Sequence, residues 1–299
     1  MIDILKLHYR ASRASRHSEP GFSRRNILNA GIGLASTPLL IGLTACSRED
    51  AQIAAVAEVA PVLLPIEFLT DTISIISGAP GNVLALTTDE GLMLVDSGSA
   101  ALAPSVRLTI EQKLEGRPVH TLFNSHYHRD QSGGNVLFGA AGAAIRAHEI
   151  TRQWLSADYY VPFEDFWVPA LAEQGRPTHT FRDKETVTLG NENIEFGYLL
   201  EAHTRGDAYV YLRDSNVLIL GDVVSPLRDP ALDWYAGGWL GGRVDAMDDI
   251  LELANADTRI IPAYGPAMTM AEFRAEHAMM RQLWESCSTL VNKGRSAQD

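Results

Sequence analysis

Four short polar segments, each placed where an apolar, strand-like run ends, constrain the fold of this 299-residue chain most strongly. The segments are residues 126–131, 202–207, 221–222 and 262–266, and the runs before them are 119–124, 194–200, 217–220 and 259–261. Strand ends gather along the edge of a sheet, so segments far apart in sequence can meet there. We therefore expect all four to converge on one edge of a sheet structure.

The rest of the pattern predicts an α+β fold. Further strand-like runs lie at 72–77, 83–87, 92–95, 143–147, 186–189 and 208–212, and helical patterns lie at 105–115, 149–155, 244–254 and 270–292. Residues 134–142 fit a helix or a loop, and the aromatic, Pro-containing stretch 159–169 favours a loop. Two β-rich blocks are each followed by helices, which predicts two mixed sheets packed face to face with helices outside.

The first polar segment carries metal-ligand chemistry. In an extended chain residues i and i+2 point the same way, so His126, His128 and Asp130 can converge on one point. Imidazole and carboxylate together suit zinc or iron. His203 and Asp222, each at the end of another strand, are the further candidate ligands.

The chain also resembles a known family. The motifs that carry the resemblance are Asp96-Ser97-Gly98, His126-x-His128-x-Asp130, His203-Thr204-x-Gly206-Asp207 and Gly221-Asp222, in that order. They are similar to those of the metallo-beta-lactamase superfamily, over residues 70–266. The resemblance implies a four-layer αβ/βα sandwich. It implies that His126, His128 and His203 hold a first metal, that Asp130 binds a second, and that Asp222 can bridge the two. Asp96 is implied to be structural, near the site.

The chain departs from the family pattern at two positions, both on the side of the second metal. Gln131 stands where the family usually has a histidine, and Tyr264 stands where the family's Gly-His-Gly motif has its histidine. An amide oxygen is a neutral ligand, and a tyrosine hydroxyl must lose its proton to bind a cation. We therefore expect one tightly bound Zn²⁺, with two ions as an alternative count and Fe²⁺ as an alternative metal.

The expected activity is hydrolysis of a small ester, lactone, amide or related substrate by a metal-activated water. Asp130 is expected to orient that water or take its proton, and Tyr264 to donate a hydrogen bond to the developing oxyanion. Trp234, Trp239 and Arg243 are the candidate substrate contacts, with packing as the alternative role of the aromatic residues and a surface role as the alternative for Arg243.

Two other functions stay open at this point. Some superfamily branches, such as persulfide dioxygenases, carry a single iron at a related site, so a mononuclear-iron oxygenase is one alternative. A lipid-anchored binding protein without catalysis is the other. The formal net charge of −12 argues against a nucleic-acid partner, because phosphate binding needs a basic surface. A small-molecule substrate is expected, and the oligomeric state is left open.

The N-terminal region is typical of an export signal. Residues 1–45 hold six Lys/Arg and two acidic residues, whereas the rest of the chain holds 19 and 35. Arg24-Arg25 resembles a twin-arginine motif, an apolar run follows, and Leu43-Thr44-Ala45-Cys46 resembles a lipoprotein cleavage box. We predict a signal over 1–45, a tether over 46–67 and the metallo-beta-lactamase-like domain over 68–299. The mature protein is expected in the periplasm, held at the membrane only through a lipid on Cys46.

Overall fold

The computed structural model describes residues 60–162, 165–224, 226–227 and 231–296, and Val59–Thr289 form one compact unit. The predicted signal over 1–45, Cys46 and most of the tether lie outside the described residues. Residues 62–67, which we assigned to the tether, instead belong to the domain. The backbone N–H of Leu64 donates to Thr109 Oγ1 at 2.9 Å, and Ile66 pairs with Ile76 in a sheet. The domain therefore begins before residue 68.

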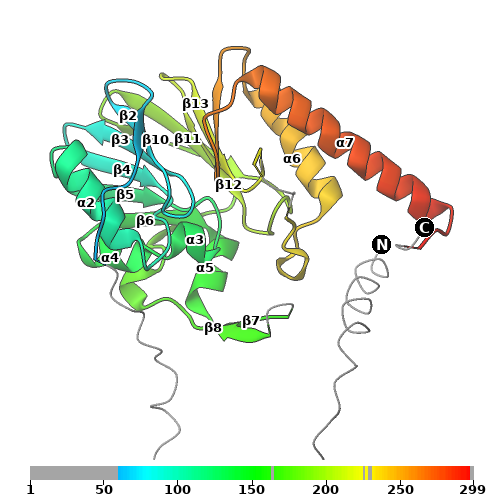
Figure 1. Ribbon diagram of the computed structural model, residues 1–299, viewed down its shortest axis with the longest axis horizontal. Helices are drawn as coiled ribbons and strands as arrows, with labels where there is room; N and C mark the ends of the chain where they lie inside the picture. Colours follow the sequence, from blue (N-terminus) through cyan, green and yellow to red (C-terminus); the bar gives the residue numbers. More distant parts are fainter. Residues whose placement is uncertain (1–59, 163–164, 225, 228–230, 297–299) are drawn as a thin grey trace, which may run out of the picture. The chain divides into compact units, whose positions relative to one another are not determined.

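Two sheets form the centre of this unit (Figure 1). In spatial order, the first contains β1 (Ile66–Phe68), β2 (Ile73–Ile76), β3 (Val83–Thr88), β4 (Gly91–Val95), β5 (Val119–Phe123), β6 (Ala144–His148) and β9 (His179–Phe181). The second contains β10 (Glu185–Leu189), β11 (Glu192–Tyr198), β12 (Ala208–Leu212), β13 (Val217–Gly221) and β14 (Arg259–Pro262). Both sheets are mixed: β1 to β4 and β10 to β13 pair antiparallel, while β4-β5-β6-β9 and β13-β14 pair parallel.

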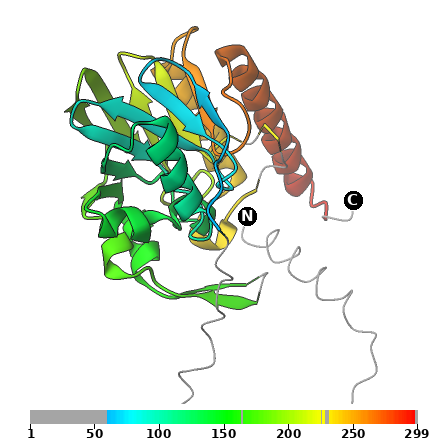
Figure 2. The ribbon, with the colours of Figure 1, turned by 60° about the vertical axis from the view of Figure 1, so that its left-hand side comes forward.

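Helices cover the outer faces of the sheets (Figures 1 and 2). They are α2 (Ala103–Lys113), α3 (Arg129–Ser132), α4 (Asn135–Ala140), α5 (Glu149–Ser156), α6 (Leu240–Leu253) and α7 (Met270–Asn292). Short 3₁₀ turns occur at Glu173–Gly175 and Trp234–Ala236. None of the helices in the described part of the chain has both the length and the apolar character needed to cross a bilayer.

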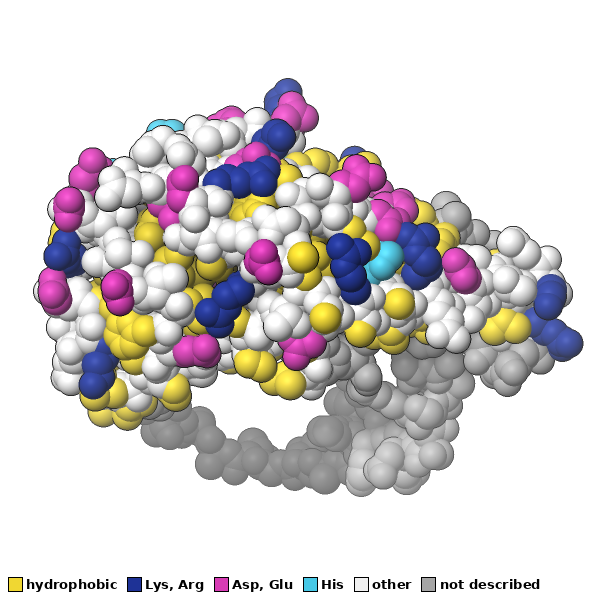
Figure 3. Space-filling view, turned by 90° about the horizontal axis from the view of Figure 1, so that it is seen from above, with side chains coloured by type: hydrophobic (Ala, Val, Ile, Leu, Met, Phe, Trp, Pro, Cys, Tyr) yellow, Lys and Arg dark blue, Asp and Glu magenta, His cyan; other side chains and the backbone are white. Residues whose placement is uncertain are grey.

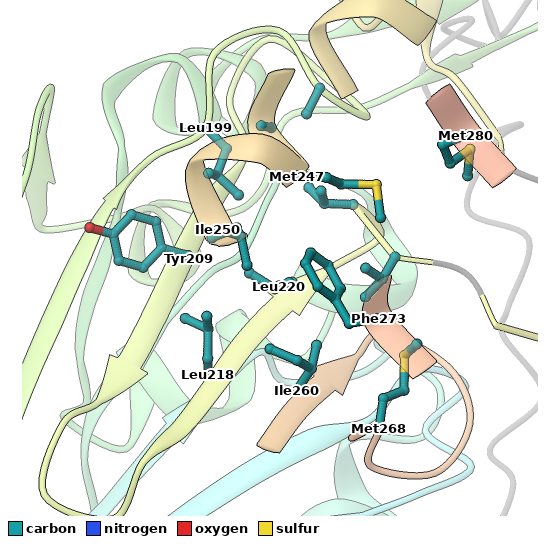
Figure 4. Close-up of a cluster of buried hydrophobic side chains, with 14 of the residues drawn as sticks. Leu199, Tyr209, Leu218, Leu220, Met247, Ile250, Ile260, Met268, Phe273 and Met280 are labelled. Atoms are coloured by element: carbon teal, nitrogen blue, oxygen red, sulfur yellow. The ribbon is translucent and has the colours of Figure 1, made fainter. Parts of the chain in front are cut away.

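Three apolar layers hold the sandwich together. Ile110 of α2 packs on the outer face of the first sheet, while Met93 and Phe196 meet between the two sheets. On the outer face of the second sheet, Met247 of α6 and Phe273 of α7 pack on strand residues (Figure 4). Strand β12 is buried along its whole length because both of its faces are covered. The predicted sandwich of two mixed sheets with outer helices is confirmed.

We had expected a loop over the whole of 159–169, but the structure shows two short strands in this stretch. Strands β7 (Tyr159–Val161) and β8 (Phe166–Val168) pair antiparallel as a separate hairpin. Tyr159, Val161 and Val168 are buried in a small cluster with Tyr127. The aromatic residues that favoured a loop assignment thus serve a strand with one packed face.

Candidate metal centre

Both sheets contribute to one group of four metal-ligand side chains. His126 and His128 follow β5 and precede α3, whereas His203 lies between β11 and β12 and Asp222 directly follows β13. One nitrogen or oxygen atom of each residue lies within 4.8 Å of the others. Asp222 Oδ2 is 3.4 Å from His126 Nε2 and 3.8 Å from His203 Nε2, and His128 Nδ1 is 3.2 Å from that same His203 nitrogen. The predicted convergence of strand ends is present.

Each imidazole has a hydrogen-bond partner for the ring nitrogen that faces away from the other ligands. His128 Nε2 lies 2.9 Å from Asp233 Oδ2, and His203 Nδ1 lies 2.9 Å from the carbonyl oxygen of Ala231. A carboxylate and a carbonyl can only accept, so each remote nitrogen carries the proton. The lone pairs of His128 Nδ1 and His203 Nε2 are then directed at the centre of the group, as metal ligation requires.

A similar chain of contacts orients His126. Its Nδ1 lies 3.0 Å from Ser125 Oγ, and that hydroxyl donates to Asp96 Oδ2 at 2.7 Å. The backbone N–H of Ser125 donates to the other oxygen of Asp96. Burial raises the pKa of Asp96 to about 7, against the opposing effect of the Ser125 hydrogen bonds. Asp96 thus acts on the site through Ser125, in agreement with the structural role that the resemblance implied.

The donor set fits a divalent metal ion. Imidazole nitrogens and carboxylate oxygens are both ligand types that zinc accepts. Burial drives the pKa of His203 well below the ordinary histidine value, so this ligand is neutral near pH 7. Burial also lowers the pKa of His128, but the hydrogen bond and charge of Asp233 outweigh it and leave this pKa raised. A proton on His128 therefore competes with a cation here.

The position beside this group is built differently. The Tyr264 hydroxyl donates a short hydrogen bond to Asp130 Oδ2, so in this structure it is directed at that carboxylate. The Gln131 side chain is fully buried and its amide packs against Gly81, where an added Cβ would lie 2.4 Å from Nε2. Within the described residues, neither amide atom of Gln131 has a hydrogen-bond partner. Asp130 is not a member of the four-ligand group.

Asp233 is a site residue that sequence reasoning missed. It is 5% exposed, and it accepts hydrogen bonds from the Tyr127 hydroxyl, from His128 and from the backbone N–H of Ala236. The only sequence signal was an aspartate just before the short turn Trp234–Ala236, where it accepts from that turn as a cap. Nothing in the sequence links it to His128, which is 105 residues away.

The three predicted substrate residues have different positions. Trp234 is 40% exposed and lines a pocket of about 450 Å³ together with Trp154, Tyr159 and Tyr235. None of the four metal-ligand residues lines this pocket. The Tyr127 ring lies between the two, since its centre is 4.6 Å from that of His128 and 4.8 Å from that of Trp154.

The other two do not face the site. Trp239 packs edge-on against Trp284 of α7, with ring centres 5.2 Å apart. Arg243 is fully buried and donates to the carbonyl oxygens of Val223 and Ala231. The expectation that Arg243 holds an anionic group of the substrate, and its surface alternative, are both wrong, because its guanidinium is occupied inside the protein.

Two kinds of enzyme are similar to this chain in sequence. A type 2 metallo-beta-lactamase of Bacillus sp. (strain 170) is 25% identical over 190 residues, which cover 62% of this chain and 67% of that protein. The alpha subunit of 2,4-dinitroanisole O-demethylase from Nocardioides sp. (strain JS1661) is 26% identical over 163 residues, covering 52% of this chain and 46% of that protein.

Solved structures share the fold at low sequence identity. A metallo-beta-lactamase from Pontibacter korlensis superposes with a TM-score of 0.60 at 19% identity, covering 73% of this chain and 99% of that one. A double mutant of the sec-alkyl sulfatase PisA1 superposes with a TM-score of 0.61 at 18% identity, covering 77% of this chain and 44% of that one. The family model of the metallo-beta-lactamase superfamily matches residues 76–265, which include the four ligands, and the chain therefore belongs to this superfamily.

Proposed function

We propose that the protein is a metal-dependent hydrolase that binds one divalent cation tightly through His126, His128, His203 and Asp222. The convergence of four ligand atoms within 4.8 Å, on side chains that are mostly buried, carries this proposal. Zn²⁺ is the cation that this donor set suits best, and Fe²⁺ is the second choice. The superfamily relatives support hydrolysis as the class of reaction.

A divalent cation bound there would supply Lewis-acid chemistry and bring the pKa of water down to about 7. The chain supplies the remaining functions. Asp130 is the carboxylate beside the ligand group, and we assign it the role of accepting a proton during attack on the substrate. Tyr264 donates its hydroxyl hydrogen to Asp130 and so keeps that carboxylate oriented. We therefore assign Tyr264 a role through Asp130 rather than contact with an oxyanion.

One ion rather than two is the count that we propose. A second ion would have to share Asp130 with the Tyr264 hydroxyl, and the buried Gln131 amide offers only a neutral oxygen beside it. In the first group, by contrast, each imidazole can bind a cation through one ring nitrogen while the other keeps its hydrogen-bond partner. A two-ion site is the alternative, and metal analysis separates the two counts.

The substrate is proposed only by class, as a small molecule with an electrophilic centre such as an ester, lactone or amide. The similar proteins include a beta-lactamase, a sulfatase and a subunit of 2,4-dinitroanisole O-demethylase, so they do not agree on a substrate that could be assigned to this chain. An aromatic-lined pocket beside Tyr127 favours an apolar substituent on that molecule. Acidic and basic side chains are interspersed on the face of the molecule drawn in Figure 3.

Export is a separate proposal. The order of a basic segment, an apolar run and a cleavage box before Cys46 favours a lipid-tethered protein in the periplasm. Mass analysis of the membrane fraction would test it, because a diacylated Cys46 at the new N-terminus is the expected result. An unprocessed chain that begins at Met1 would rule the tether out.

The decisive experiment is metal analysis of the purified mature protein, combined with turnover on a panel of esters, lactones and beta-lactams. We expect close to one equivalent of zinc, metal-dependent turnover, and loss of both in His128→Ala. Tyr264→Phe should keep the metal and lose turnover. Iron together with O₂ consumption would instead identify an oxygenase, and bound metal without turnover would favour a binding protein. Unchanged metal content in His128→Ala would refute the ligand assignment.

A further inference from the structure

Arg243, in the first turn of α6, is a cation with no exposed surface. Its Nε donates to the carbonyl oxygen of Val223 at 2.8 Å, and its Nη1 donates to that of Ala231 at 3.1 Å. Val223 and Ala231 lie on the segment between β13 and α6, at two points separated by eight positions. A planar guanidinium can hold two acceptors at a fixed distance, which a flexible ammonium cannot. Arg243 therefore fixes both backbone points relative to α6.

Both backbone points are linked to metal ligands. Val223 directly follows Asp222, so the position of its backbone constrains the backbone from which the Asp222 side chain extends. The Ala231 carbonyl also accepts from His203 Nδ1 at 2.9 Å. A carbonyl oxygen has two lone pairs and can accept from both donors at once. One arginine thus holds the acceptor that orients His203 and the residue next to Asp222.

A buried carboxylate compensates the charge of this arginine from the C-terminal helix. Glu276 Oε1 of α7 lies 3.9 Å from Arg243 Nη2, and the Glu276 side chain is 7% exposed. Burying such a pair can cost more than apolar side chains of equal volume would. Here α6 and α7 pack on the second sheet through apolar side chains such as Met247 and Phe273 (Figure 4). A charged pair in this apolar layer calls for a role beyond packing.

We propose that Arg243, with Glu276 as its counter-ion, is a positioning residue for the metal centre. It holds the Ala231 carbonyl against His203 Nδ1 and the Val223 backbone beside Asp222, so that two of the four ligands are oriented before the cation binds. This inference rests on the proposed metal site. It goes beyond it by making α6 and α7, which supply no ligand, part of what determines metal affinity.

The test compares two variants. One combines Arg243→Met with Glu276→Gln and so removes both charges of the pair, and the other is Met247→Ala. Met247 lies one turn further along α6, in the apolar cluster (Figure 4), and its side chain has no hydrogen-bond donor for the Val223 or Ala231 carbonyl. Apparent Kd values for Zn²⁺ would be measured by chelator competition. We expect about tenfold weaker binding in the double variant, at the low end for residues that orient ligands, and unchanged binding in Met247→Ala. Arg243→Lys should fall between the wild type and the double variant.

NMR of ¹⁵N-histidine-labelled, zinc-loaded protein gives a readout that simple destabilisation would not move. The Nδ1–H signal of His203 should shift or exchange faster with water, while the remote N–H signals of His126 and His128 stay in place. If the double variant does not fold, Arg243→Lys carries the same test. If the Arg243 variants and Met247→Ala have equal Zn²⁺ affinity and the His203 signal is unchanged, the role of Arg243 is refuted, while the proposed metal site still stands. A wild type that binds no metal would overturn the proposed function as well.

Discussion

The histidine side of the site and the tyrosine side lie next to each other but are prepared for a cation to different degrees. On the histidine side, Ser125, Asp233 and the Ala231 carbonyl each hold one imidazole by its remote nitrogen. On the tyrosine side, the carboxylate of Asp130 is already engaged by the Tyr264 hydroxyl, and the Gln131 amide has no hydrogen-bond partner within the described residues.

This difference shows that the number of ligand-type residues is a poor guide to how many ions a site holds. A ligand whose remote atom is hydrogen-bonded has a fixed ring orientation and tautomer, so binding a cation requires little rearrangement. A carboxylate oxygen that already accepts a hydroxyl hydrogen bond must share or give up that bond to coordinate a cation. Four experiments test this contrast, from the largest expected effect to the smallest.

Removing one imidazole should have the largest effect. His203→Ala is expected to weaken Zn²⁺ binding more than 100-fold, because loss of a ligand exceeds the roughly 10–100-fold cost of losing a partner that orients it. Gln131→Ala is the matched control on the tyrosine side and should stay within about threefold of the wild type, under ~0.7 kcal/mol. Chelator competition measures both. A comparable loss in the two variants would mean that Gln131 belongs to the same ion's ligand set.

Asp233→Asn should weaken Zn²⁺ binding roughly 10–100-fold at pH 8, because it removes the carboxylate that orients His128. The difference in Zn²⁺ affinity between the variant and the wild type should become smaller as the pH falls. In the wild type the charge of Asp233 raises the pKa of His128, so protons compete with the cation from a higher pH than in the variant. The ratio of the two affinities therefore narrows as the pH falls from 8 to 5.5. A ratio that widens over this range would contradict the role assigned to Asp233.

Restoring an imidazole on the tyrosine side should change the metal count. Tyr264→His removes the hydroxyl that engages Asp130 and supplies a second ligand, so a second, weaker equivalent of zinc is expected at saturating metal. Tyr264→Phe is the control and should remain at one equivalent. Elemental analysis after gel filtration gives the counts. A wild type that already retains two equivalents under these conditions would remove the contrast between the two sides.

The smallest effect is expected at the turn that follows His203. Thr204 donates to the buried Asp207 at 2.7 Å and accepts from the backbone N–H of Gly206, so Thr204→Val leaves Asp207 short of a donor. The expected loss is about 1–3 kcal/mol of unfolding free energy in the metal-free protein. Thr188→Val, at an exposed position, should stay within about 0.5 kcal/mol. Urea unfolding measures both, and equal losses would show that the turn adds no specific stability.

Sequence reasoning located most of the elements because each depends on a local pattern. Strand β12 and helix α7 were predicted with the bounds that the structure has, and most other elements differ by a few residues at their ends. The candidate ligands could be located for the same reason, since His126, His203 and Asp222 each follow a short apolar run whose pattern favours a strand. The hairpin at 159–169 was missed because its aromatic residues and proline resemble a loop when the packed face is unknown.

The sequence by itself determined the sandwich, because alternating apolar runs are encoded locally, and its motifs were enough to indicate the superfamily and the four candidate ligands. Only the tertiary structure decided what supports those ligands. Asp233 reaches His128 across 105 positions, Tyr264 reaches Asp130 across 134, and Arg243 lies inside the protein rather than at the substrate. Hydrogen bonds of this kind depend on which distant backbone segments are brought within 3 Å of each other, and folding alone sets that distance.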